Sequence, residues 1–237
     1  MRIDADDPVG TLLITAIRDG DRPTVHRLVT QQSGLAGARL AAAKGRTPLH
    51  VVTDWPGYYP EGPAIAQALI DAGADVDARS EGRTTETPLH WAASSDDVDV
   101  AEVLMSAGAD LEAAGGSIGT PLDNAIGYGC WHVARRLVER GVAVDKLWHA
   151  AALGDLHRLR QLLDADPAPG RDDLDEALWQ AAHGGQLRAA DLLVRRGADI
   201  RAVPGYADGG TIVAIAGGPD TRREQLRSWL LERGATE

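Results

Sequence analysis

The sequence predicts an all-α solenoid of stacked helix-turn-helix units. The first observation is a phrase that begins Thr-Pro-Leu and occurs three times, at residues 47–50, 87–90 and 120–123. The second is a Gly-Ala-Asp phrase, or a close variant, that follows downstream, at residues 73–78, 108–113, 141–145 and 197–202. Because the phrases recur at intervals typical of solenoids, we expect each repeat to be one supersecondary unit stacked on its neighbours.

Residues 87–113 show how one unit is built. Thr87 can cap a helix whose first turn holds Pro88, and the apolar residues that follow give this first, inner helix a buried face. A second, outer helix is predicted from Val98 to Met105 by apolar residues at helical spacing, and Gly108 can adopt the left-handed conformation that ends it. Neither short helix could bury its apolar face alone, so the unit needs neighbours.

These phrases closely resemble the ankyrin repeat. The resemblance implies an ankyrin-repeat solenoid with short hairpin fingers between units and a concave groove that binds other molecules. Residues 86–97 also resemble a bacterial ankyrin-repeat subfamily that is uncharacterised, which implies no activity.

Aligning one apolar residue of each inner helix gives about seven units, of which the terminal ones are degenerate. The aligned residues are Leu13, Leu49, Leu89, Leu122, Leu147, Leu178 and Ile212. We expect one ankyrin-repeat domain over residues 1–237, with units near 8–45, 46–82, 83–116, 117–144, 145–175, 176–209 and 210–237. The long second interval holds an insertion at residues 54–63, and the short fourth interval predicts that the finger after Val144 is nearly absent. The polar helix predicted at residues 222–231 is expected to cap the stack.

Charge and composition exclude several classes of function. The formal net charge of −11 repels nucleic-acid phosphates and anionic lipid, so we expect neither nucleic acid nor membrane as a partner. No signal peptide or spanning segment is evident, and a single cysteine, Cys130, cannot form an internal disulfide. We therefore expect a cytoplasmic monomer.

The motifs of enzymes and metal sites are weak here. Residues 115–119 match the Gly-x-Ser-x-Gly pattern of a nucleophile elbow, but they fall in a predicted finger turn, where glycine is expected anyway. The seven histidines include no pair with metal-protease spacing, and the resemblance implies that His50 and His90 bond local backbone groups. We therefore predict no catalytic residue, no metal site and no cofactor.

Aromatic usage is more informative, because the chain has six tryptophans and four tyrosines but no phenylalanine. Tryptophan and tyrosine are enriched at binding hot spots. The leading hypothesis is a non-enzymatic module that binds a basic partner protein through the groove, the fingers and the insertion. Its expected contact residues are Trp55, Tyr58, Tyr59, Trp91 and Tyr128. The insertion could instead be a lid packed on neighbouring helices, and that choice stays open.

The alternative hypothesis is a small-molecule site, with or without catalysis, in the groove of units three to six. It would be lined by Trp91, Tyr128, Trp148, His149, Trp179 and His183. His149 would be the general base, since an imidazole titrates near neutral pH. The competing interpretation is that Trp148 and Trp179 only fill space left by missing histidines.

Overall fold

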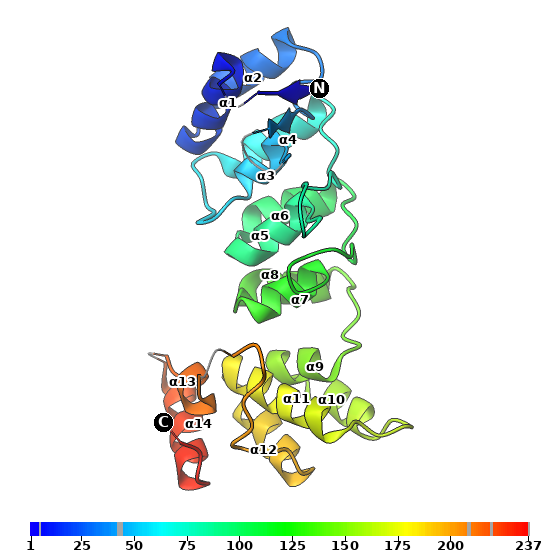
Figure 1. The fold of residues 1–237 in the computed structure, drawn as a ribbon, viewed down its shortest axis with the longest axis vertical. Helices are drawn as coiled ribbons and strands as arrows, with labels where there is room; N and C mark the ends of the chain where they lie inside the picture. The colour runs from blue at the N-terminus through cyan, green and yellow to red at the C-terminus, as the bar shows by residue number, and fades with distance from the viewer. Residues whose placement is uncertain (5, 42–44, 208–209, 219, 237) are drawn as a thin grey trace. The chain divides into compact units, whose positions relative to one another are not determined.

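The computed structural model describes residues 1–4, 6–41, 45–207, 210–218 and 220–236, and these form two compact units, Met1–Val142 and Ala143–Glu237. Each unit is a succession of paired helices (Figure 1). The all-α solenoid class predicted from the repeated phrases is confirmed. The single domain of seven repeats stays a prediction, because the chain divides into two compact units and each is described separately.

The first compact unit holds four helix pairs in two layers. Its helices are α1 (Pro8–Asp19), α2 (Arg22–Gln31), α3 (Pro48–Val52), α4 (Gly62–Asp71), α5 (Pro88–Ser95), α6 (Val98–Ser106), α7 (Pro121–Gly127) and α8 (Trp131–Glu139). The inner helices α1, α3, α5 and α7 contact one another in that order, and the outer helices α2, α4, α6 and α8 do the same. A short parallel ladder pairs β1 (Arg2–Ile3) with β2 (Arg39–Leu40), with Arg2 opposite Arg39.

The second compact unit holds three more helix pairs. Its helices are α9 (Leu147–Leu153), α10 (Leu156–Leu163), α11 (Arg171–His183), α12 (Leu187–Arg195), α13 (Ile212–Ile215) and α14 (Thr221–Glu232). Within the unit, α11 contacts α9 and α13, and α12 contacts α10 and α14. Helix α14 buries only Leu226 and Leu230, which suits an end helix with a polar outer face.

The aligned apolar residues lie in the seven inner helices as predicted. All are buried except Leu147, which is half-buried at the start of α9. Small residues let the helices approach closely: Ala92 and Ala93 of α5 are fully buried. The caps also follow the sequence, because the Thr87 hydroxyl accepts a hydrogen bond from the His90 amide and Gly108 has a φ of 89° just after α6.

The fingers are joined to one another by hydrogen bonds. The Thr85 amide donates to the Gly115 carbonyl of the next finger at 2.9 Å. The guanidinium of Arg39 donates to the Arg79 carbonyl, and that of Arg79 donates to the Ala114 carbonyl. Residues 116–120 form a bend that leads into the short helix α7, with no strand before Ser117. This local structure is that of a finger turn and differs from a nucleophile elbow.

Candidate functional site

Two histidines join successive helix pairs. The Thr47 amide donates to Nδ1 of His50 at 3.1 Å, so in the neutral ring the proton lies on Nε2, which donates to the Glu86 carbonyl at 2.9 Å. His90 repeats this arrangement with the Thr87 amide and the Gly119 carbonyl, at 3.1 Å each. The predicted bonding of these rings to backbone is confirmed, and it extends to the next unit. Burial lowers the pKa of His50 to about 4, which keeps the ring neutral.

The two histidines therefore have a structural role. Each bonds a backbone carbonyl just before the next inner helix, at the end of the finger that leads into it. The Glu86 carbonyl accepts the bond from His50, and the Glu86 side chain accepts a bond from the Asn124 amide of α7. In the part of the chain that the structure describes, no group of three or more His, Cys, Asp or Glu side chains is arranged to hold a metal ion.

A pocket of about 260 Å³ lies beside Glu86. It is lined by Thr53, Asp54, Trp55, Glu86, Trp91, Ser94, Ser95, Ser117 and Tyr128. Trp91 comes from α5, Tyr128 follows α7, and Trp55 lies in the insertion between α3 and α4. Three of the five predicted contact residues thus meet in one pocket, although they are far apart in the sequence.

The three rings differ in how they are held. Trp55 is 79% exposed and Tyr128 is 54% exposed, whereas Trp91 is half-buried. The Tyr128 hydroxyl lies 3.1 Å from the Ser117 hydroxyl, which fixes that ring against the finger. The Trp91 ring meets the His50 ring edge-on at 5.3 Å between centroids. Trp91 is thus fixed by packing, while the other two rings present open faces.

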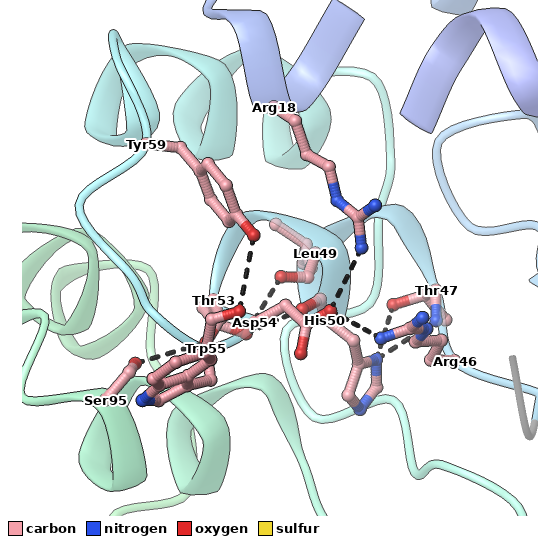
Figure 2. A network of polar contacts seen from close by, with 10 residues as sticks. All are labelled: Arg18, Arg46, Thr47, Leu49, His50, Thr53, Asp54, Trp55, Tyr59 and Ser95. Atoms are coloured by element: carbon pink, nitrogen blue, oxygen red, sulfur yellow. Dashed lines mark hydrogen bonds and ion pairs between the residues drawn. The ribbon is translucent and has the colours of Figure 1, made fainter. Parts of the chain in front are cut away.

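Asp54, one of the lining residues, belongs to an arginine-aspartate network (Figure 2). Asp54 Oδ2 lies 2.6 Å from an Arg46 nitrogen and 3.3 Å from an Arg18 nitrogen. The Arg46 guanidinium carbon also lies 5.5 Å from the Trp91 ring centroid, within the range of a cation–π contact. Asp54 is therefore already balanced by two cations of the chain itself.

Glu86 is the other carboxylate in the pocket, and it is held differently. Its Oε1 accepts hydrogen bonds from the Ser117 amide at 2.9 Å and from the Asn124 side-chain amide at 3.0 Å. Among the described residues it forms no ion pair with Arg, Lys or His. The carboxylate is thus oriented by two neutral amide donors.

The insertion is fastened to the third helix pair. The Tyr58 amide donates to Asp97 Oδ2 at 2.7 Å, and the Tyr58 hydroxyl donates to the Asp96 carbonyl. The Tyr59 hydroxyl donates to the Trp55 carbonyl at 3.4 Å, as Figure 2 shows. Tyr58 and Tyr59 are thus not among the lining residues of the pocket and hold the loop, whereas Trp55 lines the pocket and is exposed.

The residues of the alternative hypothesis divide between the two compact units. Trp91 and Tyr128 belong to the first, and Trp148, His149, Trp179 and His183 belong to the second. Within the second unit, the side chains of His149 and Trp179 are buried, at 2% and 5% exposure. Burial, together with the positive charge of Arg223, lowers the pKa of His183 to about 4. A buried ring and a weakly basic one are poor candidates for a general base.

Sequence reasoning missed the polar half of the pocket. It selected rings as the contact residues and did not select Glu86, Ser117 or Asp54. One signal was present: Glu86 directly precedes a Thr-Pro-Leu-His phrase, at the base of a finger that borders the groove. The ion pair of Asp54 carried no such signal, because it depends on Arg18 of a different helix pair.

Comparison with known proteins agrees with this fold. Residues 58–146 match the model of ankyrin repeats in three copies. Over 100 residues the chain is 37% identical to "Protein fem-1 homolog A" of Danio rerio, covering 39% of this chain and 15% of that protein. The crystal structure of the ankyrin repeat domain of human ASB11 aligns with a TM-score of 0.55 at 20% identity, over 92% of this chain and 96% of that one. The ankyrin repeat domain of Bcl-3, a member of the IkappaB family, aligns with a TM-score of 0.55 at 26% identity, over 94% and 99%.

The chain therefore contains ankyrin repeats and has the fold of an ankyrin-repeat solenoid. Ankyrin-repeat domains are in general protein–protein interaction modules. None of the helices in the described residues is both long and apolar enough to cross a bilayer.

Proposed function

We propose that this chain is a protein-interaction module that binds a partner protein through the pocket of Trp55, Trp91 and Tyr128 and the adjoining fingers. The main observation is that these three rings line one pocket together with Glu86. His50 and His90 hold the neighbouring backbone in position through their bonds to the Glu86 and Gly119 carbonyls. Exposed tryptophan and tyrosine in a rigid frame supply contact area at little entropic cost.

The chemistry of the surface favours a basic partner. The chain carries a net charge of −11, and complementary charge speeds association. One specific form of the proposal is a protein that neutralises a cationic partner. Residues 86–97 resemble a bacterial subfamily, so we look for that partner in a bacterial host.

The small-molecule alternative has less support. The pocket of about 260 Å³ is smaller than the ~300–1,000 Å³ of most metabolite and drug sites. Trp55 stands largely in solvent at its edge, so a metabolite would stay poorly enclosed. In the second compact unit, His149 is buried away from any substrate.

Affinity capture from the native lysate tests the proposal. The wild-type chain should retain a protein that a Trp55→Ala variant loses, while both chains unfold at the same temperature because Trp55 is exposed. Mass spectrometry of the eluate should identify that protein. Retention of only a small molecule by wild type would favour the alternative, and equal capture by both chains would remove Trp55 from the site.

A further inference from the structure

Among the described residues, the Glu86 carboxylate has no cationic partner, although it lies in the pocket with Trp55 and Tyr128. Its Oε1 is occupied by two neutral amide donors, and in the described residues Oε2 has no hydrogen-bond partner. Asp54, the other carboxylate of the pocket, is bonded to both Arg46 and Arg18. A half-enclosed carboxylate held in a fixed orientation is most strongly complemented by a cationic donor.

The chain already shows how such a cation is held. Arg46 places its guanidinium 5.5 Å from the Trp91 ring centroid and bonds the carboxylate of Asp54 at 2.6 Å. Glu86 together with the open faces of Trp55 and Tyr128 offers the same combination of a carboxylate and aromatic rings. Among the described residues, no Arg, Lys or His forms an ion pair with Glu86.

The remaining lining favours a planar group with several donors. The residues Thr53, Ser94, Ser95 and Ser117 also line the pocket, and hydroxyl oxygens accept hydrogen bonds. A guanidinium has five N–H donors, stacks on aromatic faces and is more weakly hydrated than an ammonium group. The pocket volume of about 260 Å³ suits one side chain better than a whole metabolite.

We infer that this pocket binds the guanidinium of an arginine side chain on the partner protein, with Glu86 as its counter-ion and Trp55 and Tyr128 stacked against it. The inference rests on the proposed interaction function and names the partner group that the pocket recognises.

The test is a titration of the purified chain with the capped peptide acetyl-Gly-Arg-Gly-amide, followed by the NMR signals of the tryptophan indoles. The control peptide carries citrulline, which has the shape of arginine without its charge. We expect a saturable shift of the Trp55 signal, assigned with the Trp55→Ala variant, and at least tenfold weaker binding of the citrulline peptide. Equal shifts with both peptides, or no saturable shift with the arginine peptide, would overturn the inference.

Two glutamate variants make the test specific. Glu86→Gln keeps an oxygen that can accept the amides of Ser117 and Asn124 but removes the charge, so it should fold normally and bind the arginine peptide about tenfold more weakly. Glu112→Gln removes the same charge from an exposed finger position outside the pocket and should bind like wild type. Equal weakening by both variants would show that only the net charge matters, which contradicts a specific site.

The two proposals fail in different ways. If capture of a protein depends on Trp55 and Tyr128 but neither the peptide nor Glu86→Gln has the expected effect, the interaction module stands and the arginine assignment is wrong. If capture does not depend on those rings at all, the proposed function itself is wrong.

Discussion

The Nε2 atom of His50 lies 2.9 Å from the carbonyl oxygen of Glu86, in the next helix pair. The same Glu86 turns its carboxylate into the pocket beside Trp55 and Tyr128. One residue thus joins the stacking of the repeats to the proposed binding surface. A change that loosens the stack at this point should also disturb the pocket.

We predict that His50→Ala destabilises the first compact unit by about 2–4 kcal/mol. The substitution leaves the Glu86 carbonyl and the Thr47 amide without their partner and opens a cavity at a fully buried site. Urea unfolding measures the loss, with His26→Ala as the control because His26 is exposed. Equal midpoints for the two variants would contradict a joining role for His50.

Acid should weaken the same contact. The folded-state pKa of His50 is about 4, below the ordinary value of 6.5, so between these values the unfolded chain binds the extra proton. The stability that His50 contributes is therefore present above pH 6.5 and lost as the pH falls toward 4, by up to about 3 kcal/mol. His90 acts in the same direction, since burial also lowers its pKa.

Urea unfolding at pH 7 and pH 5 checks this dependence. The wild type should lose stability at pH 5, and a His50→Asn variant should lose less because one of the three rings with a lowered pKa, His50, His90 and His183, is gone. Identical losses in the two chains would show that His50 is not the group that titrates.

The Asp96 side chain caps a helix of the following pair. Its Oδ1 accepts the amides of His132 and Val133 at 3.0 Å each, at the start of α8, where Cys130 has no side-chain capping bond. Because Asp96 has a φ of 56°, glycine is the substitution that removes the cap without adding strain. We expect Asp96→Gly to cost about 1 kcal/mol in a thermal or urea melt, and Asp99→Asn to serve as a control for the loss of charge. A normal melt for Asp96→Gly would remove this capping role.

The insertion is expected to act through Trp55. Tyr58 and Tyr59 bond the loop to Asp96 and to the Trp55 carbonyl, so the double variant Tyr58→Ala, Tyr59→Ala should release Trp55 from its position. We predict about tenfold weaker partner binding, measured by calorimetry or surface plasmon resonance, with little change in the melting temperature. Unchanged affinity would exclude the insertion from the binding site.

The sequence predicted the helix ends and the buried helix faces well, because both depend on residues that lie close together in the chain. Thr87, Pro88 and Gly108 specify where helices begin and end through capping and backbone conformation, and Leu89 with Ala92 specifies the buried face. These rules operate within one unit. They needed no knowledge of how the units stack.

The pocket was predicted only in part, because its polar members depend on the register between units. Trp55, Trp91 and Tyr128 could be chosen as ring types, but the pairing of Asp54 with Arg18 and the bond from Glu86 to Asn124 cross from one helix pair to another. Nor could the sequence choose between lid and docking loop. In the structure, Tyr58 is bonded to the third helix pair, as in a packed lid. Trp55 is exposed, as in a docking loop.

The most direct test of the account compares two tyrosines of equal exposure. Tyr128 and Tyr206 are 54% and 55% exposed, and each hydroxyl lies near one side-chain partner, Ser117 or Gln180. Only Tyr128 lines the pocket. The measurement is the affinity of the captured partner protein for Tyr128→Ala and Tyr206→Ala. We predict a loss of at least tenfold for Tyr128→Ala and wild-type binding for Tyr206→Ala; equal affinities would contradict the assignment of the pocket as the binding surface.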